Sequence, residues 1–218
     1  MFPTVIVINN ILETLYQIIT AGVAITAVAL LMYATNFNFR DRVVLTFALI
    51  LICVTLIYSG ETLASVANDP GTIEFFLRVK WTGLLLLPAA YLHFSGELLT
   101  LTGRPSRGRR TRAEIFIYLI SAVGLILVWA GVIVGRLAAN RLPMAYLSRN
   151  DVTFGFGLFY LLVMAMASYN LVRAFGRART TTTRRRLLYL LAGAAAPALS
   201  SIIFMFHGNR FFAENNEV

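Results

Sequence analysis

Four ionisable side chains lie within one apolar stretch of this sequence, residues 76–99: Arg78, Lys80, His93 and Glu97. Charged groups are costly in hydrocarbon, so inside a membrane segment they pair with one another or serve binding, proton transfer or ion passage. At about 100° per residue, Arg78, His93 and Glu97 share one face of a helix, whereas Lys80 falls on the far side. The pattern predicts one polar face, with the Lys80 stem extending toward the headgroups.

Two earlier apolar stretches also carry polar residues at helical spacing, in the half that we expect to lie toward the outside. Residues 13–20 and 58–65 each place polar side chains at i, i+3, i+4 and i+7. Three polar faces are therefore expected at one level of the bundle. The candidate site comprises Glu13, Gln17, Tyr58, Glu61 and Arg78.

Two interpretations of this cluster compete. The turn "NDPG", residues 68–71, makes the second and third apolar stretches an antiparallel hairpin with Glu61 and Arg78 at similar depth. In the first interpretation, these two residues form an ion pair that locks the hairpin. In the second, Glu13, Glu61 and Arg78 line a water-accessible pocket for a polar or charged ligand. A proton or ion pathway is a third alternative.

His93 and Glu97, at i and i+4, form an inner polar pair. A metal site needs at least three ligands, and the only other histidine, His207, is expected at the opposite membrane face. The pair therefore predicts a structural hydrogen bond, with no metal and no cofactor; a metal or proton-relay role is the alternative. The sequence has no HExxH, GxSxG, P-loop or CxxC motif, so we do not expect an enzyme.

The composition indicates an integral membrane protein. Of 218 residues, 58% are hydrophobic and 13% charged, and the mean hydropathy is +0.74. No predicted span shows the alternation of apolar and polar residues that is typical of a β-barrel strand, so we expect the spans to be α-helices. We predict an all-α polytopic membrane helix bundle, a single domain over 1–218, with six spans near 12–34, 43–66, 74–101, 114–135, 152–174 and 186–206.

The basic residues predict the orientation. The connection "TGRPSRGRRTR" has five arginines and the segment 173–186 has six, whereas the turn near Asp69 has none. Basic loops stay cytoplasmic, so the N-terminus is expected outside and the protein in the inner (plasma) membrane. The net charge of +9 is accordingly assigned to anionic lipid headgroups and not to nucleic acid.

The segment "YSGETLASVANDPGTIEFFLRVKWTGLLLLPAAYLHFSGELLTLTGR" resembles the N-terminal seven-transmembrane sensor region of bacterial histidine kinases. The later "TTTTRRRLLYLLAGAAAPAL" is similar to the family's basic loop and sixth helix. The resemblance implies a homodimer and PAS, GAF, kinase or diguanylate cyclase modules that follow in the cytoplasm. The matching positions, to which the resemblance assigns no role, are Arg78, Trp81, Gly83, Pro88 and Phe94.

The resemblance also implies a seventh helix, whereas six spans are expected here and the charge pattern places Val218 outside. We therefore expect a receptor region truncated after its sixth helix. A chain that ended there would need a separate cytoplasmic partner.

We predict a membrane-embedded sensor of an external or membrane-dissolved ligand that relays to a cytoplasmic output or response-regulator pathway. The alternatives are a small solute transporter or channel, which solute flux would reveal, and a structural subunit of a membrane complex, which would co-purify with a fixed partner.

Overall fold

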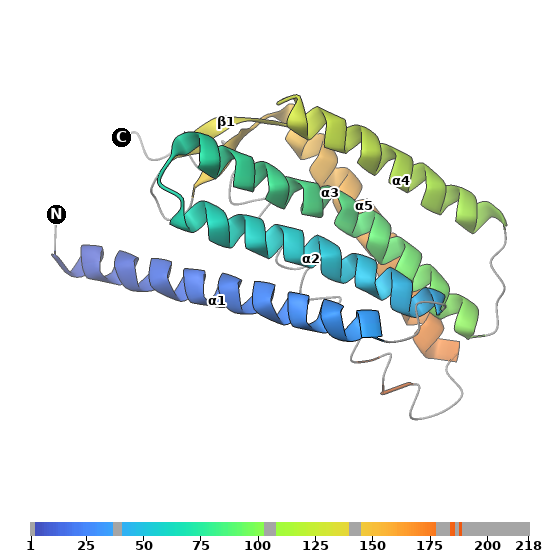
Figure 1. The fold of residues 1–218 in the computed structure, drawn as a ribbon. Coiled ribbons are helices and arrows are strands. Elements are labelled where there is room, and N and C mark those ends of the chain that lie inside the picture. The colour runs from blue at the N-terminus through green and yellow to red at the C-terminus, as the bar shows by residue number, and fades with distance from the viewer. Residues whose placement is uncertain are drawn as a thin grey trace. The chain divides into compact units, whose positions relative to one another are not determined.

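The computed structural model describes residues 3–36, 41–102, 108–139 and 145–177, together with positions 184, 185 and 188. Five helices and two short strands follow one another along the chain (Figure 1). They are α1 (Pro3–Asn36), α2 (Arg42–Val66), α3 (Pro70–Leu101), α4 (Gly108–Trp129), β1 (Val134–Ala139), β2 (Tyr146–Arg149) and α5 (Asp151–Arg177).

All five described helices are long and apolar enough to cross a membrane. The all-α, polytopic character predicted from composition is thus confirmed for these elements. The sixth expected span, 186–206, lies almost wholly outside the described residues. The third span starts at Pro70 and not at 74, because Asp69 and Pro70 already form a helix start.

The fourth expected span, 114–135, is wrong at its end. Helix α4 stops at Trp129, and Gly131 follows in the left-handed conformation with φ of 78°. The Gly131 N–H donates to the Val128 carbonyl, and the Val132 N–H donates to the Leu127 carbonyl, the two bonds of a Schellman C-cap. Glycine takes this conformation without strain, so the helix ends although the apolar run continues.

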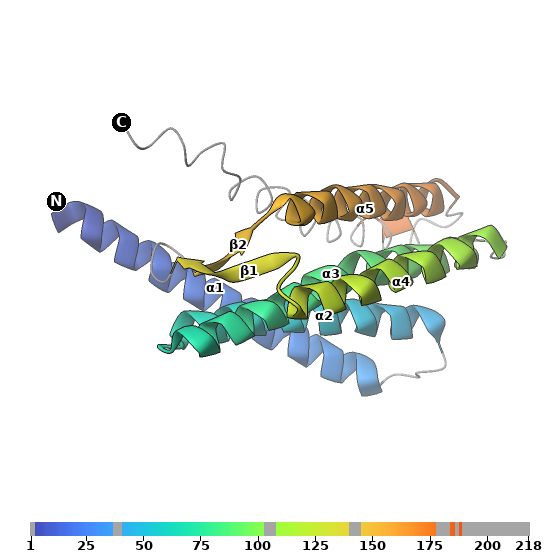
Figure 2. The same ribbon diagram turned by 90° about the horizontal axis from the view of Figure 1, so that it is seen from above.

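The continuing run begins a β-hairpin that the sequence analysis did not predict. Strands β1 and β2 pair in a two-stranded sheet and lie side by side in Figure 2. Within it, Val134 and Leu147 are buried. The sequence analysis expected a span that ends at 135 and another that starts at 152, with no strand between them.

Contacts divide the chain into two compact units. Unit 1 comprises Met1–Leu87 and Ala122–Ser148, and unit 2 comprises Pro88–Ser121 and Arg149–Val218. Helices α3 and α4 each contribute residues to both units. The boundary within α3 falls at Pro88, which has no N–H to donate to the carbonyl four residues earlier.

In unit 1, α1 lies alongside α2, and α2 and α3 form an antiparallel hairpin (Figure 1). Two glycines let the hairpin helices approach closely. A Cβ at Gly60 would lie 2.8 Å from the Phe76 carbonyl oxygen and 2.9 Å from the Lys80 backbone nitrogen. A Cβ at Gly83 would lie 2.7 Å from the Cys53 carbonyl oxygen.

Asp69 begins α3. Its carboxylate accepts hydrogen bonds from the Thr72 backbone N–H at 2.9 Å and from the Thr72 hydroxyl at 3.0 Å. These bonds favour the charged form and hold the pKa of the Asp69 carboxyl below its usual value. The cap therefore contributes stability above the ordinary aspartate pKa and loses it as the pH falls through the depressed one.

In unit 2, α5 and the C-terminal half of α3 share a polar contact, in which the Asn170 side-chain amide donates to the Ser95 hydroxyl at 3.3 Å. Helix α5 is capped by Asn150, whose side chain accepts from the Thr153 N–H at 3.0 Å. One face of α5 is buried, formed by Tyr160, Val163, Met164, Ala167, Leu171 and Ala174. The opposite face exposes Phe154, Leu158, Leu162, Met166, Tyr169 and Val172, as expected of a surface that meets lipid.

We predict that Gly60→Ala lowers the free energy of unfolding by about 1–3 kcal/mol, because the added methyl group would meet backbone atoms that cannot move independently. The measurement is thermal unfolding of purified protein in nanodiscs. Gly22→Ala is the matched control, because nothing lies within 4 Å of a Cβ at that helical glycine. Equal melting temperatures for the two variants would contradict the close approach.

Candidate functional site

A buried ion pair joins α2 to α3. The Glu61 carboxylate contacts the Lys80 ammonium, and the relative exposures of the two side chains are 7% and 11%. The register set by Gly60 produces this pairing, since the Lys80 backbone lies directly against Gly60, the neighbour of Glu61. A pair this far from water is costly to break, because either partner alone would be an uncompensated charge.

Helix α1 adds a third member to the pair. Tyr16 of α1 lies beside Glu61, and Tyr58 lies near Tyr16. We refer to Tyr16, Glu61 and Lys80 as the charge cluster.

The other expected site residues of α1 lie less deeply. Gln17 is half-buried, and its backbone carbonyl accepts a hydrogen bond from Thr20 at 3.0 Å. Glu13 is exposed. The structure therefore brings Tyr58 and Glu61 together at the α1–α2 contact and leaves the Glu13 side chain facing outward.

Arg78 holds the end of α4. Its Nη1 donates to the carbonyl oxygens of Val128 at 2.8 Å and Trp129 at 3.0 Å. Its Nε and Nη2 donate to one oxygen of Glu74 at 3.2 and 2.7 Å. Four of its five N–H groups are thus engaged. Arg78 thus adds side-chain donors to the last carbonyls of α4, of which the Val128 carbonyl also accepts from the Gly131 N–H.

The expected Glu61–Arg78 ion pair is therefore wrong. Glu61 pairs with Lys80, and Arg78 pairs with Glu74. The expected span begins at residue 74, whereas α3 begins at Pro70, so Arg78 lies about one turn farther from the helix start than expected. Glu74, four residues before Arg78, was a signal available in the sequence.

The expectation that Lys80 extends to the headgroups is also wrong, because its side chain is buried against α2. The face of α3 that meets α2 includes Phe76, Lys80 and Gly83, spaced i, i+4 and i+7. The two glycines that allow this approach are visible in the sequence. Their pairing across the hairpin is not visible in the sequence, and it is this pairing that turns Lys80 toward α2.

Aromatic side chains surround the Arg78 cap. The Trp129 indole N–H donates to the Thr82 hydroxyl at 3.3 Å, and the Phe75 and Trp129 rings meet edge to face with centroids 5.8 Å apart. Both rings are about half exposed. Amphipathic rings of this kind are enriched where a membrane meets water.

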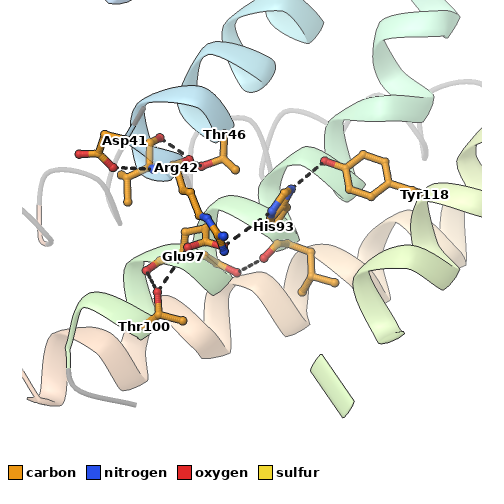
Figure 3. A network of polar contacts seen from close by, with 10 residues as sticks. Asp41, Arg42, Thr46, His93, Glu97, Thr100 and Tyr118 are labelled. Atoms are coloured by element: carbon orange, nitrogen blue, oxygen red, sulfur yellow. Dashed lines mark hydrogen bonds and ion pairs between the residues drawn. The ribbon is translucent and has the colours of Figure 1, made fainter. Parts of the chain in front are cut away.

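The inner polar pair lies in unit 2 and involves α4 (Figure 3). His93 Nδ1 lies 3.3 Å from the Tyr118 hydroxyl oxygen, and His93 Nε2 lies 3.9 Å from Glu97 Oε1. The Thr100 hydroxyl donates to the Glu97 backbone carbonyl at 2.6 Å. Tyr118 lies 25 residues from His93, so no local sequence signal indicated this contact.

The part of the chain that the structure describes contains no set of side chains that could bind a metal ion. No group of three His, Cys, Asp or Glu side chains gathers there in a geometry that could hold an ion. His207, the histidine outside the pair, lies outside the described residues.

Four of the five positions that carry the family resemblance are buried in α3, whereas Arg78 is half-buried. Trp81 and Phe94 are 6% and 5% exposed, and Pro88 is fully buried. Gly83 is the site of close approach to α2. In its most apolar window, α3 has 67% of its residues buried, the largest share among the described helices. The motif therefore lies on the most buried of the described helices.

These helices define a multi-pass α-helical membrane protein. A model of one protein family, the N-terminal 7TM region of histidine kinase, matches residues 18–215. The chain belongs to this family and is a membrane sensory input domain of that type. A search of curated proteins found no match.

We predict that Lys80→Met lowers the free energy of unfolding by roughly 3–5 kcal/mol, because Glu61 is left buried without its cation. Adding Glu61→Gln should recover much of this loss, and a double-mutant cycle on thermal unfolding in nanodiscs measures the coupling. Glu61→Gln combined with Arg78→Gln is the matched cycle and should be additive within about 0.5 kcal/mol. Coupling in the second cycle and additivity in the first would contradict the pairing.

Proposed function

We propose that this domain senses an external or membrane-dissolved ligand at the charge cluster and relays its binding along α3 to a cytoplasmic signalling partner. In this proposal the domain lies in the inner membrane with its N-terminus outside, so that the charge cluster belongs to the outer half of the bundle. The family supports the sensory role, and the arrangement of α3 supports the relay.

The observation that carries the proposal is the continuity of α3. Its 32 residues form one helix of about 48 Å, long enough to connect the two sides of a membrane. Lys80 engages α2 in its N-terminal half, and His93 engages α4 in its C-terminal half. A displacement of α3 at the charge cluster would therefore alter the packing around His93.

Ligand sensing requires two arrangements to which the ligand binds with different affinity. The charge cluster offers such a difference, because each contact in it joins a different pair of helices. Tyr16 joins α1 to α2, and Lys80 joins α3 to α2. A ligand that replaced either contact would favour a different arrangement of these three helices.

The orientation is tested by labelling of single cysteines in intact spheroplasts. After Cys53→Ala, we expect Ser148→Cys to react with an impermeant maleimide, since this exposed strand residue would lie outside. Thr111→Cys, exposed near the start of α4, should react only after lysis. The reverse pattern would contradict an external N-terminus.

The relay is tested by a distance within unit 2. Spin labels at Leu101→Cys on α3 and Arg177→Cys on α5, after Cys53→Ala, report the separation of two helix ends. Combining Glu61→Gln with Lys80→Met removes the charge pair, and we expect it to shift or broaden this distance distribution in nanodiscs. Gly22→Ala is the control that should leave it unchanged. An unaltered distribution in the charge-pair variant would contradict a relay along α3.

A further inference from the structure

The exposed face of α5 changes in character along its length. Leu158, Leu162 and Met166 follow one another at four-residue spacing and are 42–61% exposed. Tyr169 comes three residues later and is 61% exposed, and Arg173 comes four residues after Tyr169. Residues three and four apart lie on the same face of a helix. A single stripe therefore runs from apolar through aromatic to cationic, and we call it the α5 stripe.

The α5 stripe has the dimensions of one lipid leaflet. From Leu158 to Tyr169 the helix rises about 16 Å, and the hydrocarbon of one leaflet is about 15 Å thick. Tyrosine rings are enriched at the level of the lipid head groups. A phospholipid lying along the stripe would place its acyl chain against the leucines, its glycerol near Tyr169 and its phosphate beside Arg173.

Two arginines at this end of unit 2 are held by neutral rings. The Arg173 Cζ atom lies over the Tyr169 ring, 5.6 Å from its centroid. The Arg184 Cζ atom lies over the Phe175 ring, 4.7 Å from its centroid. A cation–π contact positions the guanidinium but brings no negative charge to it. The charge of each arginine is therefore not neutralised by the ring that holds it.

The local sequence supplies no counter-charge either. The segment 173–186 has six arginines, and no acidic residue occurs between Asp151 and Glu214. By contrast, both basic residues of α3 contact a glutamate carboxylate. The arginines after Tyr169 thus differ from those of α3 in having aromatic neighbours where the others have acidic ones.

This excess of charge restricts which head group fits. A phosphate accepts charge-assisted hydrogen bonds from arginine, often two from one guanidinium. A zwitterionic head group would also bring an ammonium group close to the neighbouring arginines, such as Arg177, which is exposed in the last turn of α5. An anionic head group brings no such repulsion, so a lipid with net negative charge is favoured.

The helix dipole accounts for only part of the pattern. Basic side chains near a helix C-terminus interact favourably with the last carbonyl groups, and Arg177 occupies that position in α5. The Arg173 guanidinium lies instead over Tyr169, four residues toward the N-terminus and away from those carbonyls. Its position matches the level of a lipid phosphate rather than the end of the helix.

We infer that the α5 stripe is a binding site for an anionic glycerophospholipid, whose phosphodiester is bound by Arg173. The ring of Tyr169 positions the guanidinium, and Arg177 and Arg184 add positive charge around the head group. The site belongs to unit 2 and depends neither on ligand sensing at the charge cluster nor on the orientation of the chain in the membrane.

The test measures which lipid lies against the stripe. After Cys53→Ala, Met166→Cys carries a bimane fluorophore about 10 Å along the helix from Arg173. Quenching by dibrominated phosphatidylglycerol and by dibrominated phosphatidylcholine, in vesicles that mix the two lipids, gives their relative affinity at that surface. We expect phosphatidylglycerol to be preferred, and Arg173→Gln to lower the preference by about fivefold, as for one basic residue near an anionic surface. An unchanged preference in Arg173→Gln would overturn the inference.

Two controls separate this site from general attraction between a basic protein and anionic lipid. Arg136→Gln, at an exposed position of β1, removes the same charge and should leave the preference at residue 166 unchanged. A bimane at Ile126→Cys, 70% exposed on α4, should report little preference. A loss with Arg136→Gln as large as that with Arg173→Gln, or an equal preference at residues 126 and 166, would overturn the inference.

A third arm distinguishes a lipid phosphate from free phosphate. Replacing chloride by inorganic phosphate at constant ionic strength should leave the preference for phosphatidylglycerol at residue 166 in place, because free phosphate gains nothing from the apolar part of the stripe. Loss of the preference in phosphate would show a site for free anions, and the assignment to a lipid would be wrong.

Discussion

The close approach of α2 and α3 is the constraint on which the rest of unit 1 depends. At Gly60 and Gly83 no side chain separates the two backbones, so the helices have one register. That register places Lys80 against Glu61 and turns Arg78 toward the end of α4. A shift by one residue would move Lys80 by about 100° around α3 and leave Glu61 buried without its cation.

The two basic residues of α3 have different tasks because their side chains differ. Arginine presents a planar set of five donors, which suits Arg78 for bridging two backbone carbonyls and a carboxylate at once. Lysine presents a compact charge on a long apolar stem, which suits Lys80 for reaching a buried carboxylate from a neighbouring helix. Arg78 thus holds the end of α4, from which the chain continues into β1, and Lys80 joins α3 to α2.

The helices differ in how firmly they are held. Most residues in the most apolar window of α3 are buried, whereas the fully buried residues among those described in α1 are the small Thr20, Ala27 and Ala34. In a membrane, association depends on packing and hydrogen bonds and not on removal of apolar surface from water. Among the described helices, α1 accordingly has the smallest share of buried residues in its most apolar window, and α3 has the largest.

The sequence by itself determined the membrane setting, the helical class, five of the spans in outline and the family, because hydropathy and residue order are local properties. It also located Glu61, Arg78, His93 and Glu97 as polar residues that need partners. The partners were decided only by the tertiary structure. Lys80 and Tyr118 lie on other helices from the residues that they contact, and the contacts depend on helix rotation and register. A helical wheel gives the angle between residues of one helix, but only packing at Gly60 and Gly83 determines which face meets a neighbour.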